Sequence, residues 1–134
     1  MIPSTNTILS TNLEVAVQPS KNYKLHIEHD VVNGYCDRLE AMRQVIYKIL
    51  NTERYQYVIY TWNYGIELAD LFGEPVSYVC PELKRRITEA LVQDDRIDYV
   101  DSFEFDLTEK RTVKVAFIAH TIFGEIQGEK VVNF

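Results

Sequence analysis

Three carboxylates follow the chain's only tryptophan, and they are the first residues whose spacing could support catalysis. Glu67, Asp70 and Glu74 lie three and four positions apart, so a helix through them would place them on one side. Two carboxylates can hydrolyse a glycosidic bond when they lie roughly 5 to 9.5 Å apart and one has a raised pKa. The same spacing occurs on most acidic helix faces, and no histidine or Gly-rich loop accompanies it in this segment. We therefore favour a solvated acidic face and keep a carboxylate-dependent glycoside hydrolase as the alternative.

The histidines and cysteines form no catalytic or metal-binding pattern. His26 and His29 lie three apart, and on a strand their rings would point to opposite faces. His120 has no Ser or Cys nucleophile signature near it. Cys80 precedes Pro81 at a predicted helix start, where the dipole would stabilise a thiolate, but no base is adjacent in sequence. The chain also lacks a phosphate loop and a dinucleotide fingerprint, so we predict no catalytic residue, no metal site and no cofactor.

Aromatic side chains beside a turn indicate a different kind of site. The segment YTWNYGIELADLFGEP places Trp62 and Tyr64 next to a glycine turn. We predict that these rings and Phe72 pack to support the short helix that follows, with Leu71 and Phe72 in the core. Trp62 or Tyr64 is then the predicted interface anchor, because buried aromatic residues dominate protein interfaces. Glu74, near the end of the segment, is a further predicted partner contact.

Composition restricts the classes of partner. The chain has 134 residues, 46% of them hydrophobic, which suits a single globular domain. Twenty acidic residues against fourteen Lys and Arg leave a net charge of -6, which argues against nucleic acid. The sequence has neither a signal-peptide pattern at its start nor an apolar run of about 18 residues, so we predict no membrane partner and a cytoplasmic location. Cys36 and Cys80 are predicted to stay reduced in that compartment.

The first half of the chain is predicted to hold an arm, a hairpin and a helix. Residues 1–20 have the composition of a flexible or partner-ordered arm, and residues 21–134 form a single domain. Residues 23–35 alternate as a strand or hairpin, with a turn signal at Asn33–Gly34. Helical periodicity covers residues 37–52, and Asp37 with Glu40 has the form of a capping box.

The middle of the chain is predicted to alternate between extended and helical segments. Residues 54–62 are β-branched and aromatic, which is typical of a short strand or extended segment. Residues 66–72 predict a helix of about two turns that ends at Gly73. The next helix is predicted to begin at Pro81, with ion pairs Glu82–Arg86 and Arg85–Glu89 on its outer side.

The C-terminal part alternates with a period of two. Strands are predicted over residues 97–107 and 112–117, with a third strand after a turn at Gly128. The predicted inward residues are Ile97, Tyr99, Phe103, Phe105 and Leu107 on the first strand and Val113, Val115 and Phe117 on the second. The fold class is therefore α+β, with two main helices and a short helix packed on a C-terminal three-stranded antiparallel sheet and an N-terminal strand or hairpin.

Two further positions suit contacts with another protein. Val131, Val132 and Phe134 would form an edge strand that is open for pairing with a neighbour. Arg96 lies between a helix end and a strand start, where its guanidinium can clamp a carboxylate or carbonyls across the junction. The sequence leaves open whether Arg96 acts within the fold or across an interface.

The order and spacing of three segments resemble a known family. WNYGIELADLFGEP, PELKRRITEALVQDDRI and VDSFEF are similar to the small, lysozyme-like baseplate wedge subunit of contractile phage tails, and most closely to XkdS-type proteins of PBSX-like prophages. In the wider family a Glu-Pro-Arg triplet ends the helix and begins the sheet. Here the triplet reads Asp94-Asp95-Arg96, which keeps an acid and the arginine but lacks the proline.

The resemblance implies a structural, non-enzymatic subunit related to the wedge proteins of phage baseplates and type VI secretion machines. Its implied partners are other baseplate wedge proteins and the tail sheath subunits, which would extend its sheet. The implied location is the virion tail baseplate or a tail-like particle, assembled in the host cytoplasm. No small-molecule substrate is expected, and the alternative function becomes a cell-wall glycoside hydrolase carried by the same tail.

Overall fold

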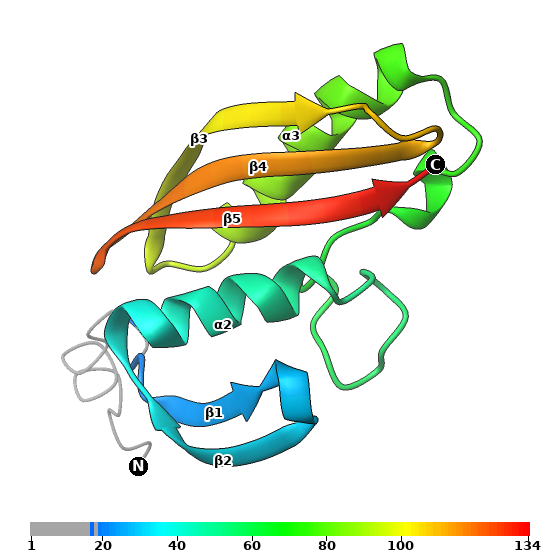
Figure 1. Ribbon diagram of the computed structural model, residues 1–134. Coiled ribbons are helices and arrows are strands. Elements are labelled where there is room, and N and C mark those ends of the chain that lie inside the picture. Colours follow the sequence, from blue (N-terminus) through cyan, green and yellow to red (C-terminus); the bar gives the residue numbers. More distant parts are fainter. Residues whose placement is uncertain (1–16, 18) are drawn as a thin grey trace, which may run out of the picture.

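A three-stranded antiparallel sheet organises the C-terminal half of the chain (Figure 1). In a computed structural model, which describes residue 17 and residues 19–134, β3 (Ile97–Asp106), β4 (Thr112–Thr121) and β5 (Gly124–Asn133) pair in that order. Most of the predicted arm, residues 1–16 and 18, lies outside the described residues. The predicted turn at Gly128 is wrong, because β5 already begins at Gly124 and Gly128 lies within it opposite Phe117.

The two main helices cover the sheet, as the periodicity predicts. α3 (Val76–Val92) packs on β3, and α2 (Arg38–Leu50) packs on β5 and on α3. Figure 1 shows α3 against one face of the sheet and α2 alongside β5. The mixed α+β class is confirmed.

α3 begins earlier than predicted, because Pro75 is its extended N-cap and Pro81 lies inside the helix. A proline at this position removes one backbone hydrogen bond to the carbonyl four residues before it. That carbonyl belongs to Ser77, which is exposed, so water can replace the missing donor. On the opposite side, Val79 and Leu83 are fully buried and hold this turn of the helix against the core.

The cap of α2 differs in part from the predicted capping box. The Asp37 carboxylate accepts a hydrogen bond from the backbone N–H of Arg38 at 2.8 Å. Glu40 forms an ion pair with Lys24 of the hairpin at 2.7 Å and does not complete the box. The helix itself is confirmed.

The N-terminal hairpin packs on the side of α2 that faces away from the sheet (Figure 1). It consists of β1 (Asn22–His26), a 3₁₀ helix η1 (Ile27–His29) and β2 (Val31–Cys36). Its turn ends at Asp30, which adopts a left-handed conformation, whereas the predicted turn residues Asn33 and Gly34 lie within β2. Gln44 of α2 joins the two, donating to the Tyr23 carbonyl at 2.7 Å and accepting from the Leu25 N–H at 2.8 Å.

The core lies between the inner face of the sheet and the two helices. Val113, Val115 and Phe117 are buried on β4, as predicted. Tyr99 of β3 is exposed, because the β3–β4 register shifts on either side of it, and its ring stacks on His120 at 4.1 Å. The predicted inward position of Tyr99 is therefore wrong. Leu107 lies beyond the end of β3 and is also exposed.

Gly128 leaves the space that the Phe117 ring fills. A Cβ at position 128 would lie 2.4 Å from Cζ of Phe117, closer than real carbon atoms approach. Phe117 is 2% exposed and also contacts the ring of Phe103, with ring centroids 5.9 Å apart. This pairing of a glycine with a large ring fixes how β4 and β5 face the helices.

We predict that Gly128→Ala lowers the free energy of unfolding by about 1–3 kcal/mol, because the added methyl group overpacks the core at Phe117. Chemical denaturation measures the change. The matched control is Gln127→Ala, an exposed β5 position whose change should stay within about 0.5 kcal/mol. Combining Gly128→Ala with Phe117→Leu should cost less than the sum of the single changes, and strict additivity would contradict this account.

Candidate partner-binding sites

The connection between α2 and α3 forms a closed loop, which we call the aromatic loop (residues 55–64). Its ends meet at a β-bridge between Glu53 and Ile66. The Ile66 N–H donates to the Thr52 carbonyl at 2.9 Å, and the Arg54 N–H donates to the Ile66 carbonyl at 3.1 Å. The predicted short strand or extended segment over residues 54–62 is wrong, because these residues form turns and pair with none of the strands in the described part of the chain.

Gly65 allows the two ends of the aromatic loop to meet. It has a left-handed φ of 89°, and a Cβ there would lie 2.5 Å from the Thr52 carbonyl oxygen. A side chain at this position would therefore both strain the backbone and collide with the opposite end of the loop.

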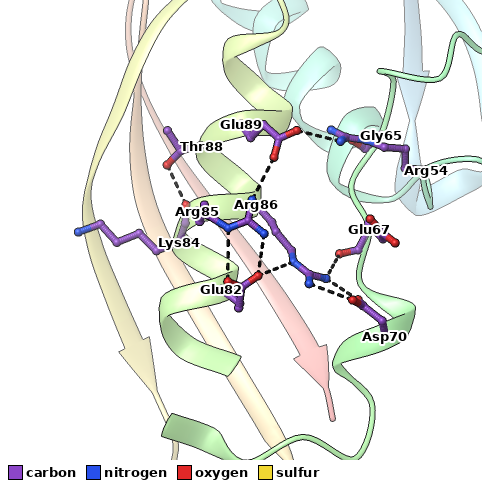
Figure 2. Close-up of polar contacts among 10 residues, drawn as sticks. All are labelled: Arg54, Gly65, Glu67, Asp70, Glu82, Lys84, Arg85, Arg86, Thr88 and Glu89. Carbon is purple, nitrogen blue, oxygen red and sulfur yellow. Dashed lines mark hydrogen bonds and ion pairs between the residues drawn. The ribbon is translucent and has the colours of Figure 1, made fainter. Parts of the chain in front are cut away.

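Arg86 of α3 ties the segment after the aromatic loop to the helix (Figure 2). Its guanidinium donates to the Glu67 carbonyl at 2.8 Å and to Glu82 at 3.0 Å, and it forms a two-pronged contact with Asp70. The Arg86 side chain is only 10% exposed, whereas that of Asp70 is 52% exposed, so a largely buried guanidinium meets a carboxylate at the surface. The helical pair Glu82–Arg86 is confirmed, but the tertiary contact with Asp70 has no signal in local spacing.

Arg54 and Glu53 stabilise the base of the aromatic loop, where its two ends meet. Arg54 donates to the Gly65 carbonyl and forms an ion pair of 3.0 Å with Glu89 of α3, which also pairs with Arg85 as predicted (Figure 2). The Glu53 carboxylate accepts from the N–H of Leu68 at 3.0 Å, next to η2 (Ala69–Leu71). The predicted two-turn helix over residues 66–72 is thus a single 3₁₀ turn. Of its backbone N–H groups, that of Ala69 bonds to the Glu53 carboxylate and that of Leu71 bonds to the Leu68 carbonyl.

Of the carboxylates that suggested hydrolysis, that of Asp70 is used in these structural contacts, whereas Glu67 contributes its backbone carbonyl. The hydrogen bond from Arg86 lowers the pKa of Asp70, whereas a general acid of a glycosidase needs a raised pKa. Burial raises the pKa of the Cys80 thiol, and Cys80 lies within α3, so neither a helix start nor a low pKa activates it. Asp70 and Cys80 therefore have properties opposite to those that catalysis requires. Both cysteines are free.

The aromatic loop exposes its apolar side chains. Trp62 is 81% exposed, so it does not support the short helix as predicted, although its position remains accessible to a partner. Tyr64 is half-buried, and its ring stacks on Tyr60 with centroids 4.4 Å apart. Leu71 is fully buried as predicted, but Phe72 is 75% exposed and the core prediction for it is wrong. The backbone turns outward at Phe72 ahead of Gly73, which has a left-handed φ.

Asp94 and Arg96 form a clamp inside the fold. The Arg96 guanidinium donates to both carboxylate oxygens of Asp94, at 2.9 and 2.7 Å, and also to the Pro19 carbonyl at 3.1 Å. The Arg96 side chain is 8% exposed and the Asp94 side chain is 11% exposed. The question that the sequence leaves open is therefore answered in favour of an internal contact for the Arg96 guanidinium.

A pocket of about 420 Å³ lies next to this clamp. Asp94 and Arg96 contribute to its wall, as does Tyr64. α2 supplies Val45, Lys48 and Ile49 on another side. A neighbouring chain could thus contact the junction of helix and sheet without breaking the internal ion pair.

β5 has a free edge. Within the described residues it pairs with β4 alone, over ten consecutive positions without a register shift. Val131 is 53% exposed, but Val132 and Phe134 are core residues at 5% and 6% exposure. Their side chains therefore pack inward, and the predicted partner contact at these two positions would have to be made by the main chain. The main chain of β5 remains available.

A groove of about 350 Å³ runs between β5 and α2. Arg43 and Tyr47 of the helix line one side of it, and Gln127 and Glu129 of the strand line the other. Lys130 crosses to Asn51, just after α2, at 3.0 Å. The free edge of β5 is thus flanked by α2, and the bond from Lys130 to Asn51 joins the two sides of the groove.

Other classes of site find no positive support. Among residues 17 and 19–134, no group of three or more His, Cys, Asp or Glu side chains could hold a metal ion. No helix in the same part of the chain has the length and apolar character to cross a membrane.

Together, the free sheet edge, the junction pocket and the exposed aromatic loop define a structural protein that presents surfaces to other proteins. Residues 16–124 match the family model of the contractile injection system sheath initiator, and the chain belongs to this family. It is also 38% identical over 121 residues to the phage-like element PBSX protein XkdS of Bacillus subtilis (strain 168), covering 87% of this chain and 85% of that relative. The family resemblance found in the sequence is confirmed.

We predict that Arg96→Ala lowers the free energy of unfolding by about 3–5 kcal/mol, because it leaves the largely buried Asp94 carboxylate without its partner. Chemical denaturation provides the value. Arg85→Ala is the control, since Arg85 also pairs with carboxylates but is 59% exposed, and it should change the free energy of unfolding far less than Arg96→Ala does. Equal effects of the two changes would show that the clamp does not stabilise the fold.

We also predict a pH dependence for this pair. Burial alone would raise the pKa of Asp94, but the hydrogen bonds from Arg96 and its charge outweigh burial, so the folded pKa is lowered. The stabilisation is then fully present above the unfolded pKa of about 4 and is lost as the pH falls through the folded value. The stability difference between the wild type and Asp94→Asn should therefore narrow below about pH 4. A difference that stays constant from pH 7 to pH 3 would contradict it.

Proposed function

We propose that this chain is a structural subunit of a contractile-tail baseplate wedge and that it starts the tail sheath by offering the β5 edge for strand pairing. The observation that carries the proposal is the regular, unpaired edge of β5 beside the groove along α2. Strand addition uses main-chain donors and acceptors and needs no catalytic group. Membership of the sheath initiator family supports this role.

The two edges of the sheet differ in their suitability. The pairing of β3 with β4 shifts register at two places, and Ser102 within β3 has a left-handed φ. Such irregularities twist an edge and restrain pairing with another chain. β5 has no shift along its length, so it is the edge on which a further strand can form a continuous ladder.

A second attachment belongs to the wedge in this proposal. The pocket beside the Asp94–Arg96 clamp would receive a neighbouring wedge protein, with Tyr64 in its wall and Trp62 on the adjacent loop. Glu74 is exposed and remains a proposed contact. Residues 21–134 would act as one wedge-subunit domain, with residues 1–20 as an arm, at the baseplate of a virion tail or tail-like particle.

The test must block pairing without unfolding the domain. Deleting the end of β5 would remove Val132 and Phe134 from the core, and with them the hydrogen bond from the Phe134 N–H to the Arg111 carbonyl at 2.9 Å. Replacing the exposed Val131 avoids this problem, because a lysine on an edge strand opposes pairing but leaves the inner face unchanged.

We predict that Val131→Lys leaves a folded subunit that enters baseplates but yields tails without sheath. Electron microscopy of the particles, with immunoblotting for the incorporated subunit, measures the outcome. Val92→Lys is the matched control, since Val92 is 43% exposed at the end of α3, on a helix and not on β5, and sheathed tails are expected from it. Normal sheathed tails that contain the Val131→Lys subunit would overturn the proposed pairing edge.

A further inference from the structure

The aromatic loop contains a concave apolar site that the proposed sheath contact does not use. It has a volume of about 470 Å³ and is lined by Tyr55, Tyr57, Val58, Tyr60, Thr61 and Trp62. Val58 is fully exposed, and Ile59 beside it is 84% exposed. Exposed apolar groups gathered in this way are typical of a surface that another molecule covers.

The rings of this site stand in two edge-to-face pairs. Tyr57 and Tyr60 have centroids 6.2 Å apart with an interplanar angle of 83°, and Tyr55 and Trp62 have centroids 6.3 Å apart with an angle of 86°. Two successive turns set this arrangement, closed by the Tyr60 N–H to Tyr57 carbonyl bond of 3.2 Å and by a second bond from Tyr64 to Thr61. The contacts of Arg54 with Gly65 and of Glu53 with Leu68 hold the base of the loop in place. The site is therefore preformed.

The polar groups on the rings of the site are tyrosine hydroxyls and one indole N–H, and their donor hydrogens are not used within the described part of the protein. In the described part of the chain, no protein acceptor bonds to the hydroxyls of Tyr55, Tyr57 and Tyr60 or to the indole N–H of Trp62. The sequence from Tyr55 to Ile66 contains no charged residue. A matching ligand is thus apolar and uncharged, and it offers acceptors.

We propose that this site binds an uncharged, proline-rich segment of a partner protein in the polyproline II conformation. The carbonyls of such a segment form no internal hydrogen bonds and can accept from the tyrosine hydroxyls and the indole. Proline has no N–H to satisfy, and its flat ring packs on aromatic faces. The preset conformation of the segment also reduces the entropy lost on binding.

Two other occupants match the site less well. The carbonyls of an amphipathic helix already bond within the helix, so they would leave the donors of the site without acceptors. A second copy of this chain would bring together two molecules of like net charge, each -6, which repel one another. The proline-rich segment is a contact additional to the sheath pairing, and neither contact depends on the other.

Fluorescence titration of the full chain tests the inference directly, because Trp62 is the only tryptophan and lies in the site. The probe is an acetylated and amidated oligoproline peptide, and a Gly-Ser peptide of equal length is the reference. We expect a saturable change in Trp62 emission with oligoproline alone. Tyr57→Ala should weaken binding at least tenfold, and Val58→Asp should do so as well.

Tyr78→Ala is the matched control, since Tyr78 lies on α3 outside the site and is 45% exposed, compared with 53% for Tyr57. It should bind oligoproline as the wild type does, and circular dichroism should show all three variants folded. Absence of a saturable change, an equal response to the Gly-Ser peptide, or equal weakening by Tyr57→Ala and Tyr78→Ala would overturn the inference. So would self-association that Tyr57→Ala abolishes, since a second copy would then be the occupant. None of these results decides the Val131→Lys experiment, because that experiment tests the β5 edge and not the aromatic loop.

Discussion

The inner face of the β3–β4–β5 sheet has to be covered, because Val113, Val115 and Phe117 all project from the same side of its central strand. α3 covers the half formed with β3, and α2 covers the half next to β5. Burying side chains of this size is worth about 1.5–3 kcal/mol each, which is more than any exposed ion pair on the surface contributes. The sheet therefore determines where the two helices pack, and α2 in turn determines where the hairpin packs.

This arrangement creates the conditions for the aromatic loop. The chain must pass from the end of α2 to the start of α3, and Arg54, Arg86 and Glu53 bind backbone groups just after the aromatic loop, at Gly65, Glu67 and Leu68. Backbone groups that these side chains satisfy need no regular secondary structure, and residues 55–63 before them lie outside both the core and the sheet. The exposed aromatic surface is thus a result of polar contacts made at a distance from it.

Periodicity in the sequence predicts those parts of this fold that depend on contacts within one element or on the burial of one face of an element. α2, the inward residues of β4 and the ion pairs along α3 are such parts. The prediction fails for residues 54–62, because β propensity expresses packing beside another strand, and none lies there. It fails at Tyr99, because a register shift reverses the face. The role of Arg96 could not be predicted, because one of its partners, Pro19, lies 77 positions away and no local pattern reveals it. The order of the family's segments, in contrast, predicts the family of the chain correctly.

The clamp at Arg96 also has a consequence for how the chain folds. The hairpin and the three-stranded meander are built from neighbours in sequence, and contacts of this kind form rapidly. The bonds from Arg96 to Pro19 and from Lys130 to Asn51 span 77 and 79 residues, so each requires the closure of most of the chain. These two bonds join an N-terminal half to a C-terminal half that can acquire their secondary structure separately. We therefore expect the docking of α2 and its hairpin onto the sheet to be the last step of folding, and the groove between α2 and β5 to form only in that step.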